Sequence, residues 1–345
     1  MVKFTTKDIA KLAGVSRATV SRVINNYPNV SADKIKRVND IINEYGYLAN
    51  SSARALAGKA NNIIELVIID INKDSKEEFA GIKSPYFNTF VIQLIQEAKK
   101  FDYLILINTV NNLSELKLLE NNFNTNLISG AIIIGMEYGN KEIYELVAKE
   151  YNIVTIDLLT EEETKSTAIK TINSKDLEGA FQACNLLITN NHKEIAYIGG
   201  DNRLSSINRH QGYLKAMKNA NIKINQNFIK TANYSKNLAY LKTIELFSQE
   251  KKPSAIFVAN DIMTLGVIKA LNELNLKIPD DVSIVTIDNG DFYFDNGLKI
   301  TNFAINLNLL AQESIALLLT SQSKKQKELT LEFNPGNTIK KLVGE

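Results

Sequence analysis

The sequence predicts an α/β protein that carries a small all-helical head at its N-terminus. In residues 1–46, three short helical patterns are separated by turn residues, whereas from residue 62 onward short β-prone runs alternate with longer helical runs. Alternation of strand and helix predicts parallel sheets covered by helices on both faces. A chain of 345 residues also exceeds what one hydrophobic core usually organises, so more than one domain is expected.

The head is expected to contain three helices, over residues 6–13, 17–25 and 31–46. The side chains expected to cap them are Thr6, Ser16 and Ser31. Gly14 lies between the first two helices, where a residue with positive φ is needed, and Gly46 ends the third. The apolar residues expected to form the small core of the head are Ile9, Leu12, Val15, Val20, Val23, Ile35, Val38 and Ile42.

Residues 47–61 lack a strong apolar period and predict a linker that is only marginally helical alone. The larger part, residues 62–345, is expected to contain strands at 63–71, 103–109, 129–135, 153–157, 169–173, 195–199, 254–259 and 282–288. Helices are expected near 86–101, 113–123, 139–150, 174–190, 205–220, 235–249, 260–275 and 307–321. The first of these places Phe87, Phe90, Val91, Leu94, Ile95 and Ala98 on one face.

Charge is divided unevenly along the chain. Residues 1–60 hold ten Lys and Arg against four Asp and Glu, a net charge of +6, while the remainder has a net charge of −4. A basic head on an acidic body points to a polyanionic partner for the head, although a basic solvated helix face gives the same count.

The segment 6-TKDIAKLAGVSRATVSRVINN-26 has the spacing of a helix-turn-helix. A small residue in the first helix, Ala10, allows close approach of the second, and Val20 and Val23 hold the two together. The second helix then exposes the side chains suited to reading bases in a major groove: Arg17, Ala18, Ser21 and Arg22. The side chains expected to donate to phosphates are Thr5, Ser16, Thr19 and Asn25.

These residues resemble the lac and gal repressor family, and the match continues through 43-NEYGYLANSSARALAGKAN-61. The resemblance implies a hinge helix over residues 47–61 that folds on operator DNA and enters the minor groove beside its dimer partner. Leu56 matches the leucine that wedges into the central base step, and an apolar wedge of this kind offsets the cost of unstacking by bending DNA onto the protein. The surrounding minor-groove positions are matched by Asn50, Ala53 and Arg54.

The resemblance extends more loosely over the rest of the chain, through 209-RHQGY-213, 256-IFVANDIMTLGVIKAL-271 and 278-IPDDVSIVTIDN-289. It implies a periplasmic-binding-protein-like (type I) domain over 62–345 that also dimerises. Its two α/β lobes would be joined by crossovers near 158–172, 289–303 and 320–330, with a small ligand between them. A cleft at the carboxyl ends of parallel strands is also the physically expected site.

Effector residues follow from the resemblance position by position. Arg209 matches the arginine that clamps the ligand, and Asp288 matches the carboxylate that binds a pair of sugar hydroxyls. Asn260 matches a cleft contact, whereas Asp261 is expected to cap its helix. The further candidates are Asp157 at a strand end, the aromatic pair Tyr86 and Phe87, and Ser205 and Leu307. Hydroxyl groups both donate and accept, which suits a site containing carboxylates and an arginine.

Two segments depart from the common pattern of the family. The loop 72–87 is longer than usual, and a similar extension occurs in regulators of galactose and β-galactoside genes, so galactose or a galactoside is the expected effector. The segment 289–307 lacks the usual Pro-Pro before its strand. A pentose, a purine and a phosphoprotein corepressor stay open, as do repression against activation and a dimer against a higher oligomer.

Other classes of protein fit less well. No GxGxxG or GxxxxGK[ST] follows a strand, and two histidines and one cysteine give no legible metal cluster, so no enzyme activity, cofactor or metal is expected. A secreted sugar-binding protein would need an export signal, which the N-terminus lacks. With no apolar run of membrane length and a single cysteine, Cys184, we expect a cytoplasmic protein with no membrane partner.

Overall fold

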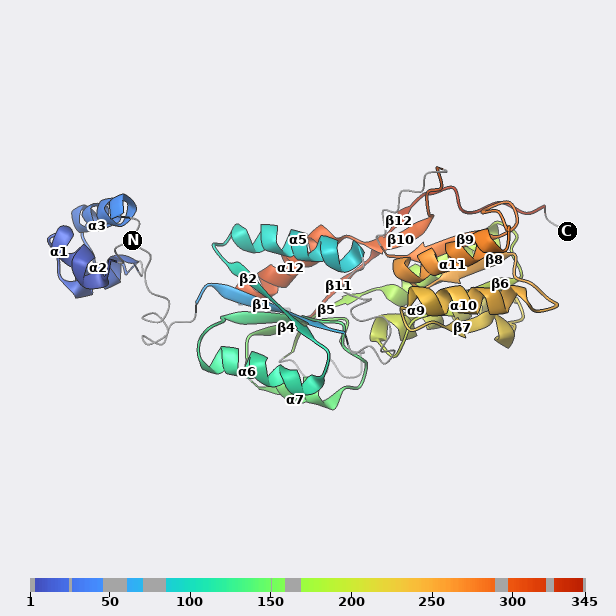
Figure 1. Ribbon diagram of the computed structural model, residues 1–345, viewed down its shortest axis with the longest axis horizontal. Helices are drawn as coiled ribbons and strands as arrows, with labels where there is room; N and C mark the ends of the chain where they lie inside the picture. Colours follow the sequence, from blue (N-terminus) through green and yellow to red (C-terminus); the bar gives the residue numbers. More distant parts are fainter. Residues whose placement is uncertain are drawn as a thin grey trace. The chain divides into compact units, whose positions relative to one another are not determined.

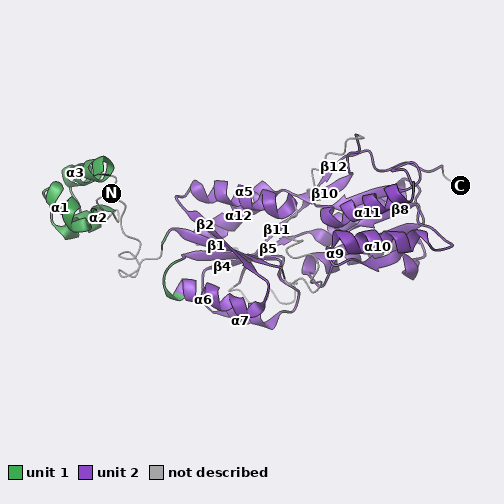
Figure 2. Ribbon diagram, in the orientation of Figure 1, with its two compact units in different colours: residues 1–61, 124–127 green, residues 62–123, 128–345 purple. Residues whose placement is uncertain are grey.

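The computed structural model describes residues 4–24, 27–45, 61–70, 85–149, 151–158, 169–288, 297–320 and 326–343. Two compact units are formed by residues 1–61 with 124–127 and by residues 62–123 with 128–345 (Figure 2). Most of the expected hinge and of the long loop 72–87 lies outside the described residues. The division of the chain at residues 46 and 61 therefore stays a prediction.

The head consists of α1 (Thr6–Leu12), α2 (Arg17–Ile24) and α3 (Ala32–Tyr45). Its core contains Ile9, Ala10, Ala13, Val20, Val23 and Val38. Gly14 has a φ of +65°, as the turn between α1 and α2 requires. Two residues predicted for this core, Leu12 and Ile35, are 43% and 36% exposed instead, because each lies at the border of the helix stripe that faces inward.

The first lobe is built on a six-stranded parallel sheet of order β11-β5-β4-β3-β1-β2. Its strands are β1 (Ile63–Ile69), β2 (Leu104–Val110), β3 (Gly130–Ile134), β4 (Ile153–Ile156), β5 (Lys170–Ser174) and β11 (Gln326–Leu329). One face is covered by α5 (Pro85–Lys99) and α12 (Leu307–Leu319), and the other by α6 (Leu116–Asn124), which follows the 3-10 turn Leu113–Glu115, and α7 (Lys141–Ala148) (Figure 1).

The second lobe repeats this plan with the order β12-β10-β9-β8-β6-β7. Its strands are β6 (Ile195–Gly199), β7 (Ile229–Thr231), β8 (Ala255–Val258), β9 (Ser283–Ile287), β10 (Asn302–Ile305) and β12 (Leu331–Asn334), of which β12 alone pairs antiparallel. Its helices are α8 (Asp176–Thr189), α9 (Leu204–Asn219), α10 (Lys236–Phe247) and α11 (Asp261–Glu273), with a 3-10 turn at Gln226–Phe228 (Figure 1). They enclose one core around Tyr213, Phe228 and Phe257.

The chain passes between the lobes at three points. These lie between β5 and α8, between β10 and α12, and between β11 and β12. The first two crossings fall just after the expected ranges 158–172 and 289–303, and the third falls within 320–330. Because the crossings end strands of both sheets, the carboxyl ends of β1, β3, β4, β6, β8 and β9 are brought to the space between the lobes.

All eight expected strands and all eight expected helices of the larger unit are present, within a few residues at each end. The strands β7, β10, β11 and β12 are not among the eight expected, because each has only three or four residues and contains polar ones. The predicted inward face of α5 is wrong at one position: Ile95 is exposed, whereas Glu97 is buried and pairs with Lys100 at 2.6 Å. Among the described residues, no helix is long and apolar enough to span a membrane.

Candidate functional site

The second helix of the head presents one polar face to solvent. Val20 and Val23 are buried against the neighbouring helices. The residues predicted to read bases, Arg17, Ala18, Ser21 and Arg22, are all exposed. The fold of the head therefore leaves this surface of α2 available for a partner.

The three described residues predicted to donate to phosphates are already hydrogen-bonded within the head. Thr5, rather than the expected Thr6, is the N-cap of α1: its hydroxyl and amide donate to the Asp8 carboxylate at 2.6 and 2.8 Å. Ser16 caps α2 by accepting from the Thr19 amide at 3.1 Å, and its hydroxyl lies 2.9 Å from that of Thr19. Of the other predicted DNA contacts, Asn25, Asn50, Ala53, Arg54 and Leu56 lie outside the described residues.

A cleft lies between the two lobes of the larger unit, with about 670 Å³ of empty space when the open solvent at its mouth is included. Seven of the eight predicted effector residues line it: Tyr86, Phe87, Asp157, Ser205, Arg209, Asn260 and Asp288. Leu307 does not. It is the first residue of α12, is only 3% exposed and packs into the core of the first lobe, so its assignment to the cleft is wrong.

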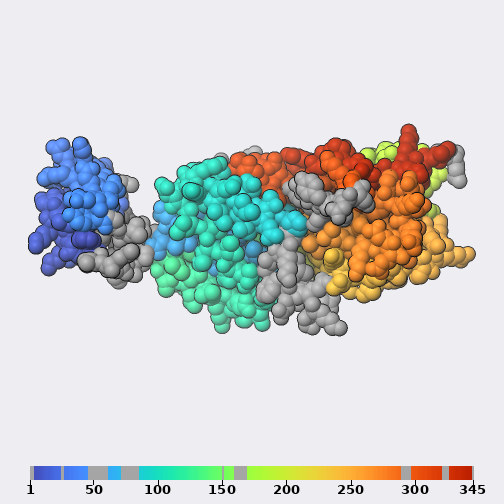
Figure 3. Space-filling view, turned by 45° about the horizontal axis from the view of Figure 1, so that its top comes forward, coloured from blue at the N-terminus to red at the C-terminus, as the bar shows by residue number. Residues whose placement is uncertain are grey.

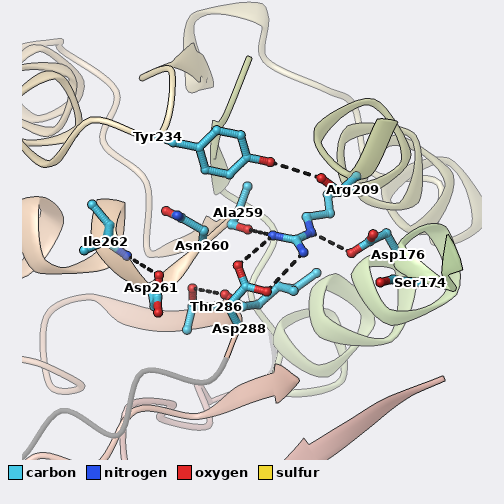
Figure 4. Close-up of polar contacts among 12 residues, drawn as sticks. Ser174, Asp176, Arg209, Tyr234, Ala259, Asn260, Asp261, Ile262, Thr286 and Asp288 are labelled. Atoms are coloured by element: carbon cyan, nitrogen blue, oxygen red, sulfur yellow. Dashed lines mark hydrogen bonds and ion pairs between the residues drawn. The ribbon is translucent and has the colours of Figure 1, made fainter. Parts of the chain in front are cut away.

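Arg209 is the electrostatic centre of the cleft (Figure 4). Its guanidinium donates from Nε to Asp176 at 2.7 Å, from Nη1 to the carbonyl of Ala259 at 2.6 Å, and from both Nη atoms to Asp288 at 3.0 and 3.1 Å. Arg209, Asp176 and Asp288 are all buried. A bidentate pair of this kind fixes the planes of both groups and thereby the positions of the lone pairs left for a ligand.

Three residues of the cleft have a positive φ, a backbone conformation that residues other than glycine rarely adopt. Asp157 has a φ of +54°, Tyr234 a φ of +57° and Asp288 a φ of +93°. Asp157 and Asp288 each follow the last residue of a strand, and Asp157 accepts from the Ser174 amide at 2.7 Å. Such conformations cost about 1–3 kcal/mol each and persist where the surrounding structure enforces them, as in binding sites.

Rings from both lobes line the cleft. Tyr86 and Phe87 begin α5 and meet edge to face, with ring centroids 5.3 Å apart. Tyr234 enters from the second lobe; the Arg203 guanidinium lies over its ring at 4.9 Å, and its hydroxyl lies 3.4 Å from that of Ser205. Burial raises the pKa of the Tyr86 hydroxyl well above its usual value, so this group stays neutral. The cleft thus offers apolar faces beside charged groups.

Asn260 and Asp261 both line the cleft, but the capping role expected of Asp261 belongs to Asn260. Asn260 is the N-cap of α11, since its Oδ1 accepts from the Met263 amide at 2.9 Å. Asp261, expected to cap, accepts from the Ile262 amide with one oxygen, while its other carboxylate oxygen is buried and has no hydrogen-bond partner among the described residues. Burial raises the pKa of Asp261 to about 7.

Sequence reasoning missed several residues of the site. Arg203, Tyr234, Gly135 and Met136 line the cleft. Asp176 does not line it, but it accepts a hydrogen bond from Arg209, which does. Gly135 has a φ of +90° and a Cβ there would lie 2.3 Å from the Ile69 carbonyl oxygen. Arg203, Gly135 and Met136 all follow ends of parallel strands, which is the one signal in the sequence that could have indicated them.

The stability of the cleft should depend on pH through Asp176. Burial, opposed by Arg209, raises the pKa of Asp176 to about 7. The pKa of Asp176 is thus higher in the folded state than the value of about 4 in the unfolded state. Its protonation therefore stabilises the fold fully below about pH 4, and this stabilisation is lost as pH rises through about 7. In wild type, the free energy of unfolding should fall as pH rises from 5 to 8. In Asp176→Asn, we expect this fall to be smaller by on the order of 2 kcal/mol, as measured by thermal unfolding at each pH. Equal losses in the two proteins would contradict this role.

The chain matches known protein families in both parts. Residues 5–50 match the model for bacterial regulatory proteins of the lacI family, and residues 184–339 match a periplasmic binding protein-like domain. It is 30% identical over 343 residues to the HTH-type transcriptional repressor PurR of Histophilus somni (strain 2336), covering 98% of each chain. It is 28% identical over 345 residues to the protein of that name from Pasteurella multocida, again covering 98% of each.

Solved structures show the same fold. The lac repressor dimer bound to operator and the anti-inducer ONPF has a TM-score of 0.81 at 22% identity, covering 98% of this chain and all of that one. A complex of the transcriptional regulator CelR with cellobiose has a TM-score of 0.70 at 21% identity, covering 97% and 99%. A lacI-family regulator from Enterococcus faecium with bound ribose has a TM-score of 0.66 at 21% identity, covering 81% and 100%.

Over 98% of its length the chain is similar to an HTH-type transcriptional repressor, and its helical head and its two sheets have the fold of the lac repressor. The protein therefore belongs to the lacI family of bacterial regulatory proteins.

Proposed function

We propose that this protein is a transcriptional repressor that binds a pseudo-palindromic operator as a homodimer and releases it when a small sugar occupies the inter-lobe cleft. The observation that carries the proposal is the buried Arg209 network at the centre of a cleft that also has aromatic faces. On the head, the exposed face of α2 supplies the base-reading side chains, with Arg22 in position to donate two hydrogen bonds to a guanine.

The chemistry of the cleft favours a ligand with several hydroxyl groups. Asp157 and Asp288 accept hydrogen bonds, Arg209 donates them, and a hydroxyl group satisfies both kinds of partner. The rings of Phe87 and Tyr234 offer apolar faces to the C–H face of a sugar ring. Galactose or a galactoside remains the predicted member of this class; most of the loop that suggested it lies outside the described residues.

A purine base is the second candidate ligand. Tyr234 and the Arg203 guanidinium above it form a flat, polarisable surface on which a heterocycle could stack, and full-length relatives carry the name PurR. Operator selected from random duplex DNA would be titrated with the protein, by fluorescence anisotropy, alone and with galactose, a β-galactoside, ribose or hypoxanthine. We expect one sugar to weaken operator binding. Tightening by hypoxanthine would support the second candidate, and no effect of any compound would refute both.

Dimerisation is proposed to use the outer surface of α5 and the edge strand β2. Leu104, Leu106 and Ile107 on β2 are 69%, 38% and 44% exposed, and Ile92 and Ile95 on α5 are 54% and 44% exposed. The α5 segment, in cyan, lies open to solvent beside α12 (Figure 3). Among the described residues β2 pairs on one side only. An edge strand with an apolar surface suits a second copy of the chain, because a symmetric dimer covers one such patch with another.

The dimer should dissociate when a charge is placed on this surface. We expect Leu104→Lys to raise the dimer dissociation constant about 10-fold to 100-fold, since it buries an ammonium group in an apolar contact. Analytical ultracentrifugation measures the change. Leu118→Lys is the matched control, because Leu118 is 52% exposed on α6, which covers the opposite face of the sheet. Unchanged association of Leu104→Lys, or an equal loss in Leu118→Lys, would contradict this interface.

A further inference from the structure

The two lobes touch each other directly at a point beside the cleft. The loop after β3 in the first lobe meets the loop after β6 in the second, where Glu137 and Arg203 form an antiparallel bridge. The Tyr138 amide donates to the Asn202 carbonyl at 3.0 Å. These backbone contacts join loops that lie more than 60 residues apart in sequence, and they exist only while the lobes lie together.

An ion pair lies at the same point. Asp70 follows the last residue of β1 in the first lobe, and Arg203 is the N-cap of α9 in the second. The Asp70 Oδ1 lies 3.8 Å from Arg203 Nη2, and their side chains are 6% and 17% exposed. Within the second lobe, Asp201 Oδ2 lies 3.4 Å from Arg203 Nε. Asp70 is thus the carboxylate that pairs with Arg203 across the lobes, and Asp201 the one that pairs with it inside one lobe.

We propose that Asp70 and the Glu137–Arg203 bridge form an inter-lobe latch that sets the resting balance between open and closed lobes. Asp70 is not among the described residues that line the cleft, and its contact with the lining is through Arg203. Resting on the proposed function, the latch thereby sets the effector concentration at which the operator is released. A protein whose binding-competent state is populated at a fraction f binds its ligand with an apparent Kd equal to the intrinsic Kd divided by f.

Removing the carboxylate should therefore open the lobes and weaken effector binding. In Asp70→Asn the attraction across the lobes is lost while the size of the side chain is kept. The population of closed lobes falls, and the apparent effector Kd rises by about threefold to tenfold because part of the binding free energy is spent on closure. Asp201→Asn is the matched control, since it removes the same charge beside the same guanidinium without touching the other lobe.

Lobe separation can be measured without any ligand. Spin labels would be placed at Lys117→Cys on α6 and Lys218→Cys on α9, both at exposed positions, while Cys184 is buried and would not be labelled. Pulsed dipolar spectroscopy on the full-length protein then reports the distance distribution between the lobes. We expect Asp70→Asn to shift it toward longer distances, Arg203→Met to shift it as far, and the double variant to shift it no further, because both remove the same pair.

A distribution that is unchanged in Asp70→Asn, or shifted equally by Asp201→Asn, would overturn the latch. Because this readout uses neither effector nor operator, it fails or succeeds independently of the proposed function. Calorimetry with whichever panel compound binds the cleft gives the second readout. An effector Kd that rises in Asp70→Asn and not in Asp201→Asn supports the latch, and an unchanged Kd in Asp70→Asn overturns its regulatory role.

Discussion

Arg209→Ala is expected to bind operator and to ignore effector at every concentration. The guanidinium donates to Asp176, to Asp288 and to the Ala259 carbonyl, so its removal takes away the cation that orients both carboxylates. We expect effector affinity to fall by at least 100-fold, as is usual when one partner of a buried charged network is lost. Anisotropy of labelled operator with increasing effector measures the response, and normal release of the variant would refute the site.

The thermal stability of Arg209→Ala has to be measured together with its effector affinity. Leaving two buried carboxylates without their cation costs about 3–5 kcal/mol. Asp288→Asn separates the two effects, because it keeps the Arg209–Asp176 ion pair at 2.7 Å while removing the carboxylate that faces the ligand. We expect Asp288→Asn to unfold close to the wild-type temperature and still to lose most of its effector affinity. Wild-type effector binding by Asp288→Asn would contradict the role of this carboxylate.

Arg22→Ala is expected to cost about 1–3 kcal/mol of operator affinity per half-site and to relax base preference at one position. Arg22 is exposed on α2, on the face opposite the buried valines, so its loss removes a base contact without disturbing the core of the head. Binding-site selection followed by sequencing measures the preference. Lys36→Ala on α3 removes the same charge away from this face and should weaken all sequences alike. An unchanged consensus for Arg22→Ala would show that Arg22 does not read a base.

The sequence predicted the elements of the fold far better than the burial of individual side chains. Long helices and apolar strands have clear periods, and all of those expected in the larger unit are present. Leu12, Ile35 and Ile95 were expected inside and are exposed. A helix stripe can be shifted by one position without changing its period, so which apolar side chains face inward is decided by the neighbouring elements.

The residues of the cleft were predicted where a local sequence pattern marks them and missed where it does not. Asp157 and Asp288 follow strand ends, which parallel topology brings together, and Arg209 carried a recognisable local pattern. Asp176 was missed because its partner Arg209 lies 33 residues away, on the next helix of the same lobe. Arg203 follows the end of β6, but its partner Asp70 lies 133 residues away in the other lobe. That Asn260 rather than Asp261 caps α11 depends on a helix start that differs by one residue, which sequence patterns do not resolve.

Sugar and operator are proposed to bind competing arrangements of one dimer. Linkage then requires that operator weaken sugar binding by the same factor by which sugar weakens operator binding. Calorimetric titration of the effector into the free protein and into its operator complex measures this factor directly, and anisotropy supplies the reverse factor. We expect the two factors to agree and to exceed about fivefold. The same effector Kd with and without operator would contradict the account.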